Sequence, residues 1–226
     1  GALEAVGHKC LRLPTSNGKI TAEQVDTLIQ NHYNDASAEH TVQPGIVYIS
    51  FPTESGTLYS KQELTELYAV CQTHNIPLFI DGARLGYGLM AKNNDVTFED
   101  IANLCDVFYI GGTKVGALFG ECIVILNDLY KKDFRYSIKQ HGGMLAKGRM
   151  LGIQFEELFK DNRYLTISKH AIDMADILTE GFQSKGYSFF FPAETNQLFP
   201  IFENTKLKEL SQEFAFTPWI KIDETH

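Results

Sequence analysis

The chain has 226 residues, of which 44% are hydrophobic, and its 20 basic and 28 acidic side chains give a formal net charge of −8. An acidic chain without a basic run is a poor candidate for binding nucleic acid or an anionic membrane surface. No apolar stretch approaches the roughly 18 residues that a membrane-spanning helix needs. We therefore expect a cytoplasmic protein that binds neither nucleic acid nor membrane.

The four cysteines show no pattern of a metal site or a disulfide framework. They stand at positions 10, 71, 105 and 122, and no two form a CxxC pair. Each lies within or beside an apolar segment, which predicts buried free thiols in a reducing compartment. The seven histidines show neither HxxxH nor HxxH spacing. We therefore predict no metal site.

Short strands and helices alternate through the first 126 residues. Strands are expected at residues 8–14, 45–50, 77–81, 106–111 and 121–126. Helices are expected at residues 21–33, 60–75 and 97–105. The first helix begins with a capping box of Thr21 and Gln24, and the second with one of Ser60 and Glu63. Apolar strands separated by helices are typical of an α/β fold with a mostly parallel sheet that helices cover on both faces.

The character of the sequence changes after residue 130. Residues 131–159 place a glycine pair before a long helical pattern, and 164–186 form a second one. The segment 187–202, YSFFFPAETNQLFPIF, has the pattern of strands in a smaller α+β region. We expect a domain boundary here, with residues 1–162 in a large domain and 163–226 in a small C-terminal domain.

A dinucleotide fingerprint is present only as a weak match. Residues 86–91, GYGLMA, fit the pattern GxGxxA. In that fingerprint the first glycine makes the turn directly after the strand, so that the helix N-terminus meets the pyrophosphate. Here DGAR (81–84) occupies the turn. We therefore expect no nicotinamide or flavin site.

Two strand ends carry charged residues in unusual positions. The strand 77–81 ends on Asp81, and Lys114 lies in a glycine-rich turn between two apolar strands. Taken singly, a turn aspartate and a solvated lysine are the ordinary interpretations. Together they predict a pyridoxal phosphate site, because that cofactor needs a lysine for its aldehyde and an anion for its ring nitrogen. Both residues would follow strands of a parallel sheet, where α/β proteins bind their ligands.

Four segments resemble a known family. FIDGARLGYGLM (79–90) and CDVFYIGGTKVGALFGECIVI (105–125) resemble the threonine aldolase branch of the β-eliminating lyases, which are pyridoxal-phosphate enzymes of the aspartate-aminotransferase fold. ISFPTESGTLYS (49–60) and GALEAVGHKCLRLP (1–14) also look like family segments. The resemblance implies a three-layer α/β/α fold (fold type I) and a homodimer or homotetramer.

The resemblance also implies roles for individual residues. Lys114 would be the Schiff-base lysine, Asp81 the partner of the pyridine nitrogen, and Arg84 the guanidinium near the cofactor's phenolic oxygen and the substrate. Thr53 falls where many family members carry a histidine in contact with the substrate, so the base that handles the substrate hydroxyl is unassigned. The alternative for Arg84 is an ion pair with Asp81 or Asp106.

A glycine-rich loop of the family resembles QHGGMLAKGR (140–149). An arginine that commonly follows the glycines is Leu145 here, and Lys139, Lys147 and Arg149 are the candidates to replace it. The family's phosphate-binding loop and ring-stacking residue would precede this chain, and a carboxylate-binding arginine would follow it. We therefore expect a partial chain of a longer enzyme.

The reaction that the resemblance implies is retro-aldol cleavage of a threonine-like β-hydroxy-α-amino acid to glycine and an aldehyde. The same electron sink serves β-elimination, so another pyridoxal-phosphate amino-acid lyase is one alternative. The other is an inactive fragment of such an enzyme.

Overall fold

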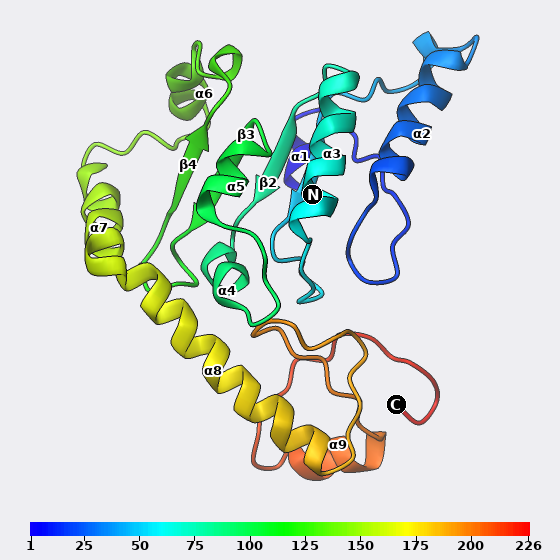
Figure 1. Cartoon of the computed structure of the whole chain (residues 1–226), viewed down its shortest axis with the longest axis vertical. Coiled ribbons are helices and arrows are strands. Elements are labelled where there is room, and N and C mark those ends of the chain that lie inside the picture. The colour runs from blue at the N-terminus through cyan, green and yellow to red at the C-terminus, as the bar shows by residue number, and fades with distance from the viewer.

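The chain first forms a four-stranded sheet with its surrounding helices. Two longer helices and a C-terminal part come after the sheet in the sequence. Figure 1 shows the computed structural model, which describes residues 1–226. The strands are β1 (Val47–Ser50), β2 (Leu78–Asp81), β3 (Val107–Gly111) and β4 (Glu121–Ile125). The helices are α1 (Ala2–Ala5), α2 (Ala22–Asn34), α3 (Lys61–Thr73), α4 (Leu85–Met90), α5 (Phe98–Asn103), α6 (Phe134–Gln140), α7 (Arg149–Phe159), α8 (Arg163–Ser184) and α9 (Asn204–Leu210).

The four strands lie in the order β1-β2-β3-β4. β1, β2 and β3 run parallel, with Ile49 beside Ile80 and Ile80 beside Phe108, whereas β4 runs antiparallel to β3. Parallel neighbours need a crossover connection, and α3 lies between β1 and β2, while α4 and α5 lie between β2 and β3. The predicted α/β fold with a mostly parallel sheet is confirmed. The carboxyl ends of the three parallel strands lie together on one side of the sheet. We call this side the carboxyl edge, or simply the edge, of the sheet.

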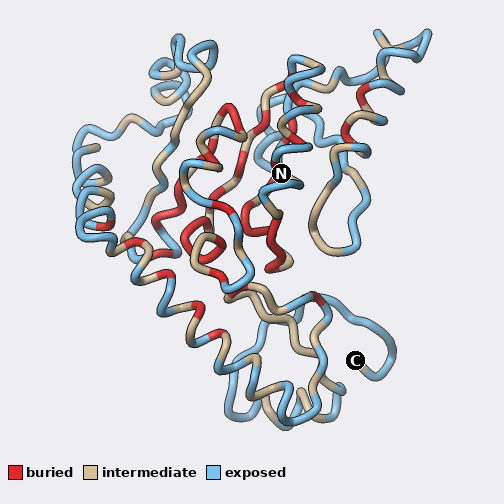
Figure 2. The backbone as a smooth tube through the Cα atoms, in the orientation of Figure 1, coloured by how far each residue is buried: buried red, intermediate tan, exposed pale blue.

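The two faces of the sheet differ in burial. Leu78, Ile80 and Phe108 are buried, in one core cluster with residues of α2, α3 and α5. On the opposite face Tyr48 is 45% and Ile123 46% exposed. Figure 2 shows the buried residues concentrated in the sheet and the segments around it. The alternation along each strand therefore separates a packed face from a half-open one.

The predicted helix starts are confirmed. In α2, Thr21 N donates to Gln24 Oε1 at 2.9 Å and Gln24 N donates to Thr21 Oγ1 at 3.2 Å. In α3, Ser60 and Glu63 form the same reciprocal pair. Helix α5 begins with a third capping box, at Thr97. Each box satisfies two backbone N–H groups that the first turn leaves without partners.

Two expectations for the N-terminal part were wrong. Residues 8–14 form no strand, because no other segment pairs with their backbone. Cys10, in this stretch, is exposed rather than buried. Cys71 and Cys105 are buried as expected, and burial raises the pKa of both thiols to about 12. The strand-like pattern of residues 8–14 forms no strand, because no neighbouring strand is available to pair with it.

The strands expected within 187–202 also did not form. One isolated antiparallel bridge joins Phe189 to Pro200. Pro192 and Pro200 have no backbone N–H to donate, and no third segment extends the pair. Beyond α8 the chain contains one α-helix, α9.

None of the helices in the structure is both long enough and apolar enough to cross a membrane.

The glycines of GYGLMA serve packing. A Cβ at Gly86 would lie 2.2 Å from Ser168 Oγ and 2.8 Å from Tyr164 Cε1, so the glycine lets α8 lie directly on α4. A Cβ at Gly88 would lie 2.8 Å from Pro52 Cδ. This close approach explains the glycines of the fingerprint-like sequence without a dinucleotide.

Candidate functional site

Asp81 and Lys114 follow neighbouring strands at the same edge of the sheet. Asp81 is the last residue of β2, and Lys114 lies three residues beyond the end of β3, in the turn that leads to β4. β2 and β3 are adjacent and parallel, and the turns after them point toward α4 in Figure 1. The carboxylate and the amine therefore lie at adjacent strand ends, a common position for ligand-binding groups in α/β sheets.

Two glycines bring the turns after β2 and β3 into direct backbone contact. Gly111 N donates to Gly82 O at 2.8 Å. A Cβ at Gly82 would lie 1.9 Å from Tyr109 O, and a Cβ at Gly111 would lie 2.2 Å from Ala83 O. Both neighbours are backbone atoms that cannot turn away, so only glycine fits at either position. The two turns owe their closeness to these glycines.

Both carboxylate oxygens of Asp81 accept hydrogen bonds. Oδ1 accepts from the Tyr109 hydroxyl and from Ala83 N at 2.9 Å, and Oδ2 accepts from the Tyr48 hydroxyl. Burial, and then the hydrogen bond to Asp81, raise the pKa of both tyrosines well above its ordinary value. Sequence reasoning missed the two tyrosines, although each lies in a strand that the sequence predicted beside Asp81.

The turn that carries Lys114 is tied to α4 and α8, while the lysine itself is exposed. The Tyr87 hydroxyl donates to the backbone carbonyl of Lys114. The Tyr164 hydroxyl donates to Gly111 O at 3.0 Å and accepts from Gly86 N at 3.2 Å. Burial raises the pKa of both phenols. The backbone beneath the amine is thus fixed by two tyrosines from the helices.

Arg84 occupies the N-cap position of α4, three residues after Asp81, and its side chain makes no capping hydrogen bond. The structural alternative for Arg84 was an ion pair with Asp81 or Asp106. Asp106 accepts instead from Leu78 N and from the side chain of Asn127, both at 2.9 Å. Asp81 is held by its three donors. Neither carboxylate pairs with Arg84, which leaves the guanidinium available at the edge of the sheet.

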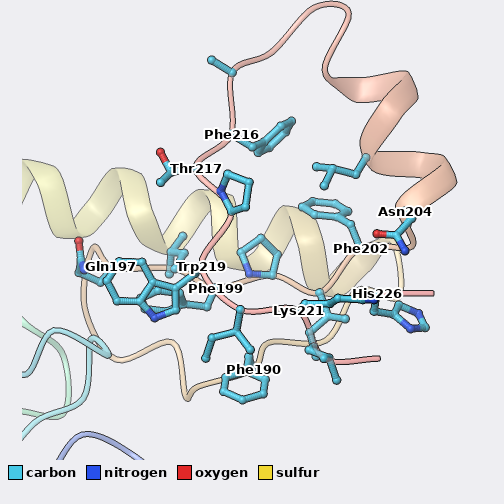
Figure 3. A pocket seen from close by; sticks show the side chains of 18 of the residues that line it. Phe190, Gln197, Phe199, Phe202, Asn204, Phe216, Thr217, Trp219, Lys221 and His226 are labelled. Atoms are coloured by element: carbon cyan, nitrogen blue, oxygen red, sulfur yellow. The ribbon is translucent and has the colours of Figure 1, made fainter. Parts of the chain in front are cut away.

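Arg84 also lines a cavity of about 700 Å³. All other lining residues lie between 190 and 226, and Figure 3 shows aromatic side chains gathered around the space. Phe199 and Trp219 have ring centroids 5.4 Å apart. The Oδ1 atom of Asn196, another lining residue, is buried without a hydrogen-bond partner. The predicted carboxylate and amine do not line this cavity, so Arg84 alone connects it with them.

Thr53 lies inside the packed part of the chain. Its side chain is 2% exposed. Thr53 Oγ1 lies 2.7 Å from Thr57 Oγ1 and accepts from Thr57 N at 3.2 Å. A Cβ at Gly18 would lie 2.9 Å from the same Oγ1. The hydroxyl is therefore occupied within its own loop, and contact between Thr53 and a substrate stays a prediction.

The loop that contains Thr53 is joined to the C-terminal part. Leu58 N donates to Glu194 Oε2 at 2.8 Å, and the Thr195 hydroxyl donates to Gly56 O at 2.9 Å. A third bond runs from the Gln197 side chain to the carbonyl of Glu54, at 3.0 Å. We call these three hydrogen bonds the clamp. They connect two segments about 140 residues apart in the sequence.

The segment 140–149 begins on the opposite side of the sheet, where the parallel strands have their amino ends. The end of β4 pairs with Val107, the first residue of β3, and α6 follows there, far from α4 in Figure 1. Lys139, Lys147 and Arg149 are all exposed. No hydrogen bond joins this segment to the turns of the predicted site. The chain does not bring these basic residues to its own carboxylate and amine.

Comparison with known proteins shows close relatives. The sequence profile of the family described as beta-eliminating lyase matches residues 1–205. The chain is 30% identical over 194 residues to a low specificity L-threonine aldolase of Pseudomonas aeruginosa, covering 85% of this chain and 55% of that protein. A low specificity L-threonine aldolase of another Pseudomonas strain is 30% identical over 197 residues, with the same coverage. The chain spans about half the length of these curated relatives.

The chain is also similar to solved structures. A threonine aldolase of Leishmania major is 45% identical, with a TM-score of 0.95 over 100% of this chain and 65% of that one. An aspartate aminotransferase of Thermus thermophilus is 15% identical, with a TM-score of 0.52 over 76% of this chain and 44% of that one. The second likeness shows the shared fold alone.

Proposed function

Because the chain belongs to the beta-eliminating lyase family, we propose that it uses pyridoxal phosphate to cleave a threonine-like β-hydroxy-α-amino acid to glycine and an aldehyde. The observation that carries the proposal is the placement of Asp81 and Lys114 at adjacent strand ends. The 45% identity to the Leishmania major threonine aldolase over the whole chain supports it. The two low specificity L-threonine aldolases support the same reaction.

The residues at this edge fit the polar groups of pyridoxal phosphate. The cofactor carries a ring nitrogen that needs an anion, an aldehyde that needs an amine, and a phenolic oxygen that a cation stabilises. Asp81 offers a carboxylate held in place by hydrogen bonds. Lys114 offers an exposed amine, and Arg84 a guanidinium that neither Asp81 nor Asp106 neutralises.

Each of these residues then has one task. When bound, the cofactor supplies an electron sink that stabilises negative charge on the α-carbon of the substrate. Asp81 would hold the proton on the ring nitrogen, and Lys114 would supply the amine that the cofactor aldehyde needs. Arg84 would hold an anionic oxygen of the cofactor or of the substrate. The groups that orient the substrate would decide between aldol cleavage and β-elimination, since the same electron sink would serve both reactions.

An absorbance spectrum of the protein with pyridoxal phosphate tests the cofactor. We expect a band in the visible, and borohydride should fix the cofactor on Lys114, identified by peptide mass spectrometry. Lys114→Ala should show neither. A panel of amino acids scored for aldehyde, and separately for ammonia and pyruvate, tests the reaction. Ammonia and pyruvate without aldehyde would replace the aldolase proposal by β-elimination.

We also propose that the protein forms a homodimer or homotetramer. Leu118 is 86% exposed and lies in the turn that carries the predicted lysine, next to the exposed Phe119, and it lines a shallow surface depression with the exposed Ile153 of α7. Gln154 Oε1 accepts from Leu118 N at 2.7 Å and from Phe119 N at 3.3 Å. An exposed apolar patch with a fixed backbone is typical of a contact surface.

The position of 140–149 supports the same assembly, because basic residues far from their own site are available to a neighbouring copy. Light scattering should give at least a dimer at the concentration of the activity assay. An active monomer would contradict this proposal.

We further propose two domains, 1–162 and 163–226, and a cytoplasmic location. Asp161 and Asn162 have left-handed backbones, with φ of 53° and 57°, and separate α7 from α8. The location rests on the four free thiols.

A further inference from the structure

Asp81 receives more hydrogen bonds than a turn aspartate needs. The N–H of Ala83 alone closes the turn, at 2.9 Å from Oδ1. In addition, Tyr48 of β1 and Tyr109 of β3 donate their hydroxyls to the carboxylate from the strands on either side of β2. We propose that Tyr48 and Tyr109 are positioning residues that fix the Asp81 carboxylate toward the ring nitrogen of pyridoxal phosphate. The inference rests on the proposed function and assigns two residues to the cofactor site.

The register of the sheet explains how both tyrosines reach one carboxylate. Tyr48 pairs with Phe79, and Ser50 pairs with Asp81. Side chains two residues apart on a strand share a face, so Tyr48 and Asp81 lie on the same face. On the other side, Tyr109 follows the pair of Ile80 and Phe108. Tyr109 is therefore the residue beside Asp81.

The phenol rings are themselves held in place by Phe79. The rings of Tyr48 and Phe79 are stacked, with centroids 5.1 Å apart and an interplanar angle of 8°. The rings of Phe79 and Tyr109 lie 6.1 Å apart at 50°. A row of three aromatic rings on the half-open face therefore limits how far either hydroxyl can move. Rigid donors on both sides restrict rotation of the carboxylate.

A count of acceptor sites shows where a ligand can bind. An ionised carboxylate has about four lone-pair sites, two on each oxygen. On Asp81, Oδ1 accepts from Tyr109 and Ala83, while Oδ2 accepts from Tyr48 alone. The one open site is on Oδ2. A ring N–H that donates to it would complete the set without displacing a tyrosine.

The tyrosine hydroxyls are protonated at neutral pH and can act as donors there. Burial and the bond to Asp81 raise the pKa of both phenols, so each keeps its proton. A charged and fixed acceptor is what a protonated ring nitrogen requires.

Cofactor affinity, measured with two forms of the cofactor, separates positioning from general structure. One form is pyridoxal phosphate, and the other is its deaza analogue, in which carbon replaces the ring nitrogen. Fluorescence titration of the intact protein gives the Kd for each form. Tyr48→Phe and Tyr109→Phe should each weaken pyridoxal phosphate about tenfold, because each removes a hydrogen bond to a charged group. Neither should change the Kd of the deaza analogue.

Tyr33→Phe is the matched control. Tyr33 is 56% exposed, and its hydroxyl accepts one hydrogen bond, from Gln43 Nε2 at 3.0 Å. Its affinity for both forms should equal that of the wild type. Equal losses for both forms in the Tyr48 and Tyr109 variants, or no loss for either, would overturn the inference and leave the proposed function intact. A wild-type protein that binds neither form would overturn both.

Discussion

The sheet edge around Asp81 and the C-terminal part beyond α8 are built in different ways. At the edge, Ile80 and Leu85 are fully buried, and Gly111 N donates a hydrogen bond to Gly82 O. Beyond Ala175 only two residues are buried, as the pale C-terminal tube of Figure 2 shows. The edge is therefore close-packed, whereas the C-terminal part lines most of the open cavity of about 700 Å³.

The difference shows that aromatic content alone does not make a core. The C-terminal part is rich in aromatic pairs, such as Phe202 with Phe216 at 5.6 Å and Phe199 with Trp219 at 5.4 Å. Trp219 nevertheless remains 55% and Phe216 38% exposed. Burial needs a second layer of structure, and a strand needs a paired backbone. The sheet edge has both within this chain.

We expect the largest loss of stability from a substitution at Gly82, which tests the close packing of the sheet edge. Gly82→Ala places a Cβ 1.9 Å from Tyr109 O, a backbone atom. We expect a loss of about 4 kcal/mol in the free energy of unfolding, because the two turns must separate. Gly181→Ala in α8 is the control, since nothing lies within 4 Å of the added Cβ. It should gain about 0.5 kcal/mol from helix propensity. Urea unfolding measures both, and equal stabilities would refute the close packing of the edge.

The next effect concerns the chemistry of the edge. Asp81→Asn keeps the size of the side chain but removes the charge that holds the ring nitrogen protonated. We expect cofactor binding to persist while turnover falls about a hundredfold, or about 3 kcal/mol in the barrier. Asp95→Asn, which removes a carboxylate that accepts from Lys61 N at 2.9 Å, is the control and should keep its rate. Near-normal turnover of Asp81→Asn would show that Asp81 only stabilises the turn and takes no part in the reaction.

A smaller effect is expected at the clamp between the two regions. Glu194→Ala removes the acceptor of Leu58 N and leaves that N–H without its partner at 2.8 Å. We expect a loss of about 1.5 kcal/mol in the free energy of unfolding. Limited proteolysis should also cut the C-terminal part sooner. Glu213→Ala, at an exposed position of the same part, should change neither. If both variants behave alike, the clamp does not hold the two regions together.

The smallest effect is expected in the C-terminal part itself. Trp219→Leu replaces a ring that is 55% exposed, so the free energy of unfolding should fall by less than about 1 kcal/mol. Tyr59→Leu, at a position 1% exposed, should cost about 3 kcal/mol. Thermal unfolding of the two variants compares the regions directly. A larger shift for Trp219→Leu would show that the C-terminal rings form a core.

The local structure and the order of the elements could be predicted from the amino-acid sequence. Capping boxes at Thr21 and Ser60 and apolar runs before Asp81 mark helices and strands through contacts between residues close in sequence. Alternation of strands and helices then predicts parallel neighbours. From this follows the placement of Asp81 and Lys114 at one edge, because parallel strands share their carboxyl ends.

Which segments pair with which could not be predicted from the sequence and became clear from the folded chain. Residues 8–14 have a strand-like pattern but no neighbouring backbone, and 187–202 form one bridge for the same reason. The register of β1 and β3 against β2 brings Tyr48 and Tyr109 to Asp81, and nothing in the local sequence sets that register. A pattern describes one segment, whereas pairing and burial depend on two, so the partners of Asp81 became visible only in the folded chain.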